Sequence, residues 1–289
     1  MDAKFAIIAG SGGYDILSNG DFGKNLECKK IPTPFGESSP IHKFSKDDID
    51  FLFLSRHGEE RYSISAPFVN YRANIWAFKE CEVERIISWS GPGIINNRFS
   101  VGDFLLPHDI IDETKNRHYT FFEKKGIGFI RQKSPFCEEI KEVLIKALQE
   151  LKLKFHNKGV YVCTQGPRLE TPAEINKYKI SGGDIVGMTL CPETFLAREL
   201  EMCYAPICYL TNFAEGISDR PFKKGELFEG MINNDEQKKV SSASKRFPVI
   251  IRKSIELFQR LERNCSCKDA LHRYKKDGII SKDWRSWVQ

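Results

Sequence analysis

The sequence predicts a single α/β domain in which a central mixed β-sheet is flanked by helices. Apolar runs alternate with amphipathic helical segments along most of the chain, no linker-like stretch interrupts them, and the apolar runs end in small or polar residues. This alternation favours a parallel or mixed sheet whose faces are covered by helices. We expect the domain to span residues 1–267 and to be followed by a charged, aromatic tail at residues 268–289.

The predicted strands are short apolar runs, as expected for strands that are buried on both faces. The first, Phe5–Ala9, runs directly into a glycine turn. Open α/β sheets bind ligands at the carboxyl ends of their strands, so the polar residues found there are candidate site residues. The other predicted strands are Asp50–Ser55, Arg85–Trp89, Gly159–Thr164, Asp184–Met188 and Pro206–Leu210.

The predicted helices lie between these strands. The clearest opens at Ser134 and Pro135, with Ser134 as the N-cap, and carries one apolar face as far as Leu151. The polar run from Asp219 to Ser244 has no helical or strand period, so we expect a mobile segment there. The other predicted helices are Asn70–Glu80, Pro172–Ile180, Pro192–Met202 and Lys245–Arg263.

The composition is that of a globular protein rather than of a disordered or membrane protein. The 44 basic and 39 acidic residues give a net charge of +5 without any basic block, so we expect no nucleic-acid partner. The apolar N-terminal run turns to glycine within ten residues, which is too short for a membrane span and lacks the pattern of a signal peptide. We therefore expect a cytoplasmic protein with no membrane partner.

The nine cysteines are irregularly spaced, and no C-x-x-C pair occurs among them. The sequence thus contains no zinc or redox motif, and we predict no metal site. Cys265 and Cys267 form the one close pair. We expect this pair to be structurally incidental, with a stabilising disulfide as the alternative.

Six short motifs follow one another along the chain, several of them at the ends of predicted strands. Their order and spacing resemble the methylthioadenosine phosphorylase and purine nucleoside phosphorylase family over about residues 4 to 217. The resemblance implies a nucleoside phosphorylase-like fold, phosphorolysis of a purine nucleoside, inorganic phosphate as co-substrate, no cofactor, and a homotrimer or homohexamer. The motifs are Gly10-Ser11-Gly12, Thr33–Gly36, Arg56-His57-Gly58 with Asn70–Ala77, Gly166–Thr171, Gly187–Glu193 and Thr211-Asn212.

The residue types suit phosphate binding independently of the resemblance. Backbone N–H groups and a small hydroxyl in a glycine turn can approach an anion closely, as at Ser11. Arg56 offers a guanidinium fork that matches phosphate oxygens, with His57 beside it. The resemblance adds three further phosphate ligands, which are Ser90, the Gly91 amide and Thr189. It also implies that Met188 lies against the sugar.

Asn212 and Glu170 predict the purine. By resemblance, members of the family that take 6-aminopurines place an aspartate where Asn212 stands and another where Ala214 stands. A 6-oxopurine presents an acceptor at O6 and a donor at N1–H. The Asn212 amide can donate to O6 and accept from a protonated N7, whereas the Glu170 carboxylate accepts from N1–H. We therefore predict inosine, guanosine or methylthioinosine as the substrate, with Asn212, Glu170 and His57 as catalytic residues.

Two other functions remain open. One keeps the mechanism and changes the base, giving a methylthioadenosine phosphorylase. The other is a non-catalytic relative that binds a purine or nucleoside. Glu170 also has an alternative role, because it precedes a predicted helix and could cap or ion-pair there.

The chain departs from the family pattern at two places. Trp89 and Pro92 stand beside the expected phosphate ligand Ser90, where a bulky and a rigid residue could reshape the site. Glu59 and Glu60 follow the Arg56-His57-Gly58 motif, and carboxylates aimed at a phosphate would oppose its binding. By resemblance, Tyr62 lies near a sugar-facing position.

Overall fold

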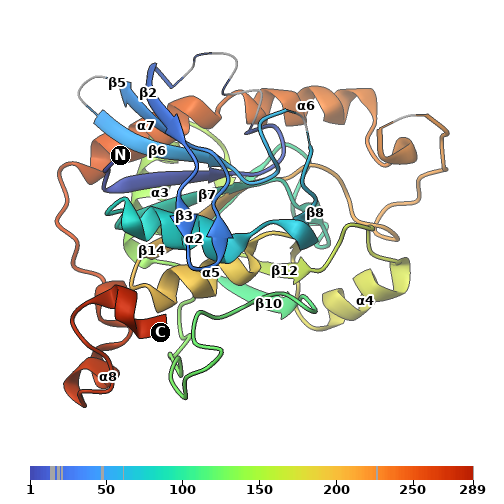
Figure 1. Cartoon of the computed structure of the whole chain (residues 1–289). Helices are drawn as coiled ribbons and strands as arrows, with labels where there is room; N and C mark the ends of the chain where they lie inside the picture. The colour runs from blue at the N-terminus through green and yellow to red at the C-terminus, as the bar shows by residue number, and fades with distance from the viewer. Residues whose placement is uncertain are drawn as a thin grey trace.

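The computed structural model describes residues 1–13, 17, 20, 22–46, 49–60, 62–225 and 227–288. Its main layer is an eight-stranded sheet of order β11-β9-β14-β7-β1-β6-β5-β2 (Figure 1). The central four strands are parallel and carry the most apolar runs of the chain. They are β1 (Phe5–Ala9), β6 (Ile49–Ser55), β7 (Arg85–Ser90) and β14 (Cys203–Tyr209).

Antiparallel strands extend this sheet on both sides. On one side β5 (Ile41–Lys46) pairs with β6, and β2 (Lys24–Lys29) pairs with β5. On the other side β9 (Phe104–Leu105) pairs with β14, and β11 (Phe155–His156) pairs in parallel with β9. The sheet is therefore mixed, with its parallel part in the middle.

A second sheet of order β10-β12-β13-β8 lies next to the first. Its three parallel strands are β10 (Asp109–Glu113), β12 (Val160–Thr164) and β13 (Ile185–Gly187), and the antiparallel β8 (Gly93–Ile94) completes it. A short hairpin of β3 (Pro32–Thr33) and β4 (Gly36–Glu37) stands apart. Because β8 follows β7 in the chain, the two sheets meet close to the carboxyl end of β7.

Helices cover both faces of the main sheet. α3 (Glu138–Glu150) and α7 (Phe247–Phe258) pack together on one face, and α2 (Tyr71–Glu80) and α5 (Leu190–Glu199) on the other (Figure 1). α4 (Pro172–Ile180), α6 (Asn234–Ser244) and the short α8 (His272–Lys276) lie towards the outside. The 3-10 helices are η1 (Ala66–Phe68), η2 (Leu227–Gly230), η3 (Ser266–Asp269) and η4 (Trp284–Val288).

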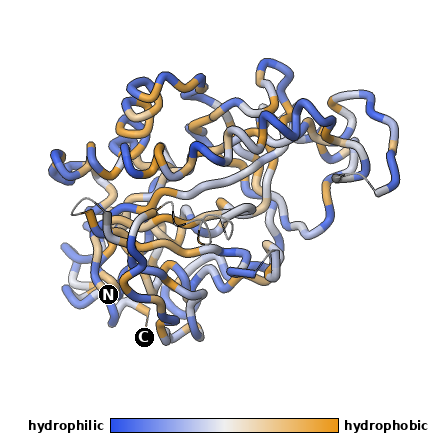
Figure 2. The backbone as a smooth tube through the Cα atoms, turned by 90° about the horizontal axis from the view of Figure 1, so that it is seen from above, coloured by the Kyte–Doolittle hydropathy of each residue, from blue (hydrophilic) through white to orange (hydrophobic). Residues whose placement is uncertain are grey.

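The predicted fold class is confirmed, and each of the six predicted strands is present. Figure 2 shows the hydrophilic backbone mostly at the periphery, with apolar stretches running through the interior. Two hydrophobic clusters form the core, a large one around the main sheet and a small one beside the second sheet. Among the described residues, no helix is long and apolar enough to cross a membrane.

Two predictions about the helices were wrong. The helix predicted from Ser134 begins at Glu138 with Cys137 as its N-cap. The Cys137 N–H donates to the Tyr204 carbonyl at 2.8 Å, which ties the residue before the first turn of α3 to β14, and residues 133–136 form bends rather than helix. The polar run from Asp219 to Ser244 contains α6, which is started by a capping box between Asn233 and Glu236 rather than by an apolar face.

The segment after Cys267 packs against the rest of its own chain. Leu271, Tyr274 and Trp287 are buried in the large core cluster. Trp284 contacts Trp76 of α2 with the ring centroids 4.6 Å apart, and Arg285 pairs with Glu80 at the end of the same helix. The C-terminal segment thus covers α2, as Figure 1 shows for its red ribbon beneath that helix.

Candidate active site

The carboxyl ends of the central parallel strands bring three of the predicted motifs together. Ala9 of β1 is paired with Ser55 of β6 and with Trp89 of β7, so the residues that follow these strands are neighbours. Gly10 lies where they meet, because a Cβ there would come 2.8 Å from the Trp89 carbonyl oxygen and 3.4 Å from Arg56 Nη1. Only glycine allows the backbone to approach this closely.

Arg56 is fully buried at the centre of this junction. Its Nη1 donates to Thr189 Oγ1 at 2.8 Å, and its Nη2 donates to Ser88 Oγ at 2.7 Å. Nη2 also donates to Glu193 Oε2 at 3.0 Å, and Nε lies 2.9 Å from Glu193 Oε1. The sequence analysis missed Ser88 and Glu193 as partners of Arg56, although Glu193 ends the Gly187–Glu193 motif.

Glu193 gives the buried guanidinium its counter-charge. Tyr204 donates its hydroxyl to Glu193 Oε2 at 2.7 Å, so the carboxylate is bonded to residues from two further elements. Burial raises the pKa of Glu193, while the neighbouring Arg56 lowers it. The ion pair fixes Arg56 in one position, and Thr189, which accepts from it, keeps its hydroxyl hydrogen to donate to an anion.

His57 lies beside this pair and is buried. Its Nδ1 donates to the Ile64 carbonyl at 2.8 Å, which leaves Nε2 of the neutral ring as an acceptor. Burial, helped by the positive charge of Arg56, lowers the pKa of His57 to about 4. Tyr62, 46% exposed, stacks on the imidazole with the ring centroids 4.1 Å apart. His57 is therefore a neutral acceptor at pH 7 rather than a second cation.

The turn after β1 is tied to the end of β14. Tyr209 donates its hydroxyl to the Ser11 carbonyl at 3.0 Å, and a Cβ at Gly91 would come 3.0 Å from the Tyr209 ring. Ser90 at the end of β7 is buried, and its Oγ lies 3.3 Å from the Tyr161 hydroxyl of β12. Ser11, Ser90 and Gly91 thus lie around one junction between the two sheets.

The departures from the family pattern leave this junction intact. Trp89 is fully buried, stacks on Tyr209 and contacts the tilted ring of Phe247 in α7, so it packs into the core. The Pro92 carbonyl accepts from the Thr211 N–H at 3.1 Å, which fixes the loop after β7.

The Glu59 carboxylate bonds to His42 of β5, so its charge is directed to that imidazole, and the side chain of Glu60 is exposed.

The two predicted base ligands follow strands of different sheets. Glu170 Oε1 accepts from Thr164 Oγ1 at 2.5 Å, and Thr164 ends β12. Asn212 follows β14, where its Oδ1 accepts from Thr211 Oγ1 at 2.8 Å and its Nδ2 donates to the Phe213 carbonyl at 3.0 Å. Both side chains are half-buried. Among the described residues, no hydrogen bond joins the side chains of Glu170 and Asn212.

The helix beside Glu170 has its own cap. Thr171 accepts from the Glu174 N–H, and Glu174 accepts from the Thr171 N–H, so these two residues form the capping box of α4. The proposed capping role of Glu170 is therefore filled by its neighbours, and its bond to Thr164 turns it towards the strand ends.

Arg117, which was not predicted from the sequence, joins the segments that carry the predicted purine and sugar ligands. It is buried, and its guanidinium donates to the carbonyls of Met188 (2.7 Å), Cys191 (2.6 Å) and Gln165 (2.7 Å). The predicted sugar-facing Met188 also approaches Gly166 so closely that a Cβ there would overlap its sulfur. No local motif marks Arg117, because all of these acceptors are distant in the sequence.

Ala214 makes apolar and backbone contacts only. It is buried in the small core cluster beside Ile95 and Val186, and its N–H donates to the Ile94 carbonyl at 2.9 Å. A carboxylate at this position would need room and a polar partner. Its surroundings supply hydrophobic side chains instead.

The fold and the comparisons with known proteins define a phosphorylase of the α/β type. Residues 4–256 match the model of the phosphorylase superfamily, and the chain belongs to this family. A 6-oxopurine nucleoside phosphorylase from Pyrococcus furiosus is 43% identical over 275 residues, covering 93% of this chain and 97% of that protein. A probable S-methyl-5'-thioinosine phosphorylase from Thermodesulfovibrio yellowstonii is 40% identical, covering 94% and 97%.

Solved structures agree with the fold. A methylthioadenosine phosphorylase from an antarctic soil metagenomic library superposes with a TM-score of 0.86 at 27% identity, covering 100% of this chain and 99% of that one. The resemblance found in the sequence is thereby confirmed, and the family match extends over residues 4–256.

Proposed function

We propose that this chain is a pentosyltransferase that cleaves 6-oxopurine nucleosides with inorganic phosphate, giving the free base and a sugar 1-phosphate. The observation that carries the proposal is the buried Arg56 guanidinium, held by Glu193 and Ser88 and bonded to the Thr189 hydroxyl. A buried cation next to several hydroxyls at strand ends is suited to an anion, and phosphate is the anion that this reaction requires.

In this proposal, each residue around Arg56 has a role in binding phosphate. Arg56 supplies positive charge, and Ser11, Ser90, Thr189 and the Gly91 amide donate hydrogen bonds to phosphate oxygens. The neutral His57 accepts the hydrogen of a protonated phosphate oxygen through Nε2. The bound anion lies beneath C1′ and stabilises the positive charge that develops on the sugar as the bond to the base breaks.

The preference for a 6-oxopurine base is supported by the match of hydrogen-bond donors and acceptors between the base and the protein. Glu170, oriented by Thr164, accepts from N1–H of a 6-oxopurine, whereas the unprotonated N1 of adenine would leave that carboxylate without a donor. Asn212 donates to O6 and accepts from N7 as the leaving purine gains a proton. A mismatched pair of buried polar groups costs about 1–3 kcal/mol, which gives a clear preference between the two bases.

We further propose that the chain forms an oligomer, a homotrimer or a homohexamer. Three aromatic side chains, Phe68, Tyr119 and Phe129, are 77%, 66% and 79% exposed, and they come from η1 and from the loop after β10. Arg72 of α2 pairs with Glu123 at 2.9 Å, so this loop lies against the helix that follows η1. Light scattering of the purified protein gives the subunit number, and Phe129→Ser is expected to lower it.

The deciding experiment measures release of free purine from inosine, guanosine, methylthioinosine and methylthioadenosine, each with and without phosphate. Phosphate-dependent release of hypoxanthine or guanine is the expected result. Release of adenine alone would keep the reaction and replace the proposed base, and release without phosphate would indicate a hydrolase. Purine binding without release from any nucleoside would indicate a non-catalytic relative.

A further inference from the structure

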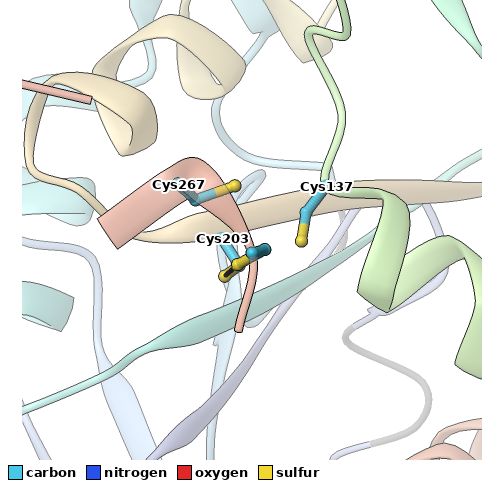
Figure 3. Close-up of side chains that lie close together, drawn as sticks. Cys137, Cys203 and Cys267 are labelled. Atoms are coloured by element: carbon cyan, nitrogen blue, oxygen red, sulfur yellow. Dashed lines mark hydrogen bonds between the residues drawn. The ribbon is translucent and has the colours of Figure 1, made fainter. Parts of the chain in front are cut away.

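Four cysteines that are far apart in the sequence converge behind the main sheet. Cys137 caps α3, Cys203 begins β14, and Cys265 and Cys267 lie at the start of η3. Their four sulfur atoms all lie within 4.8 Å of one another, and the structure contains all four as free thiols. Figure 3 shows Cys137, Cys203 and Cys267 side by side from these three elements.

The arrangement has the dimensions of a tetrahedral thiolate site. Zinc binds thiolate sulfur at about 2.3 Å, which places the sulfurs of a tetrahedral site about 3.8 Å apart. The Cys203 and Cys265 sulfurs are 3.2 Å apart, too far for a disulfide bond and close to the spacing around a shared ion. Small changes in the four cysteine side chains would place all four sulfurs at bonding distance from one zinc ion.

The surroundings of the sulfurs favour negative charge at the cluster. Arg263 donates from Nε to Cys203 Sγ at 3.2 Å, and its Nη2 donates to the Glu201 carbonyl, so the guanidinium is held against the sulfur. N–H donors to metal-bound sulfur are a common outer shell of thiolate sites. Cys265 is partly exposed, which gives an ion a path from solvent, whereas the other three are buried.

We propose that Cys137, Cys203, Cys265 and Cys267 form a structural zinc site that fastens the C-terminal segment to the core sheet. Each cysteine gives up its thiol proton to solvent on binding, and one Zn²⁺ takes four thiolates with no change in oxidation state. Closed four-sulfur sites of this kind are structural rather than catalytic. The sequence analysis predicted no metal because the ligands come from three separate segments without a C-x-x-C pair.

The test begins with the metal content of the intact protein. The chain is purified under reductant, loaded with Zn²⁺, freed of excess ion by gel filtration, and measured by elemental mass spectrometry. We expect one zinc per chain, and replacement by Co²⁺ is expected to give the visible spectrum of a tetrahedral thiolate site. Cys267→Ser is expected to weaken zinc binding by more than about tenfold and to lower the melting temperature.

Cys28→Ser is the matched control. Cys28 lies with His42 and Glu59 in another group of possible ligands, so zinc content that falls in Cys28→Ser but not in Cys267→Ser would overturn the assignment. Reduced protein that retains no zinc would also overturn it, as would intact-mass measurement showing that the four cysteines remain in two disulfides under reductant. The zinc content and the Co²⁺ spectrum of the wild-type protein test the proposal even where a variant does not fold.

Discussion

At the scale of single residues, the proposed phosphate site depends on one buried charge and its partner. Replacing Glu193 by Gln leaves the Arg56 guanidinium buried with its charge uncompensated, because the carboxylate faces both Nε and Nη2. Breaking a buried ion pair from one side costs about 3–5 kcal/mol, and we expect Glu193→Gln to lower the free energy of unfolding by that amount. Urea denaturation measures it.

Glu150→Gln is the control for this substitution. Glu150 pairs with Lys253 at 2.7 Å on the surface, where removal of an ion pair costs about 0–1 kcal/mol. Equal losses in the two variants would mean that Arg56 does not need a buried counter-charge.

Asn212 determines the choice between purines in the proposed reaction. An aspartate at this position cannot donate to O6, so Asn212→Asp is expected to lower kcat/KM for inosine by about 10- to 100-fold. The ratio of kcat/KM for methylthioadenosine to that for inosine should rise. Asn157→Asp adds the same charge at an exposed position and should leave both values unchanged. An unaltered ratio in Asn212→Asp would remove Asn212 from base recognition.

The lowered pKa of His57 makes the folded protein less stable as the pH falls below about 6.5. Its pKa is about 4 in the folded protein against 6.5 for the free group, so the unfolded chain binds more protons between these values. Its contribution is fully present above pH 6.5 and is lost as the pH falls towards 4. Between pH 7 and pH 5 this amounts to about 2 kcal/mol of unfolding free energy. Denaturant titrations of wild type and His57→Gln should differ in this slope, and parallel slopes would contradict the shift.

At the scale of elements, the pairing of β13 with β12 beside the proposed site requires a glycine at position 187. A Cβ at Gly187 would overlap the hydroxyl of Tyr161, which lies 3.3 Å from Ser90 Oγ. Gly187→Ala is therefore expected to lower the free energy of unfolding by about 1–3 kcal/mol and also to raise the KM for phosphate. Gly126→Ala is the control, since a Cβ there meets nothing within 4 Å. If Gly187→Ala leaves both the free energy of unfolding and the KM for phosphate unchanged, the Tyr161 side chain can move aside without cost.

The elements that could be predicted from the sequence are those whose own residues specify them. The central strands are continuous apolar runs, and the family motifs at their ends predicted Arg56 and Thr189 as site residues, whose side chains form a hydrogen bond in the structure. α6 was missed because a capping box and tertiary contacts, rather than an apolar period, establish it. The start of α3 was misplaced because the Cys137 bond to Tyr204 delays the first turn.

The same limit applies to the site. Ser88 and Glu193 bond to Arg56 across 32 and 137 positions of sequence separation, and the acceptors of Arg117 are 46 to 74 residues away. Such contacts depend on how the strands are ordered in the sheets. A single sequence gives the residue types at each strand end but not which strand ends become neighbours.

At the scale of the whole molecule, the C-terminal segment is expected to unfold together with the sheet. Trp287 is only 2% exposed within the large core cluster, and its Nε1 donates to the Ser281 carbonyl at 2.9 Å. Truncation of a buried tryptophan costs about 3–5 kcal/mol, so Trp287→Ala should lower the melting temperature of the entire protein in one cooperative transition.

The control for Trp287→Ala lies in the same segment. Ile279 is 57% exposed, and Ile279→Ala should change the free energy of unfolding by no more than about 0.5 kcal/mol. Scanning calorimetry separates the two possible behaviours of the segment. A single transition that shifts as a whole means that Trp287 belongs to the common core. A separate early transition in Trp287→Ala, with the main transition unmoved, would mean that the C-terminal segment is an independent unit whose loss leaves the sheet and its site folded.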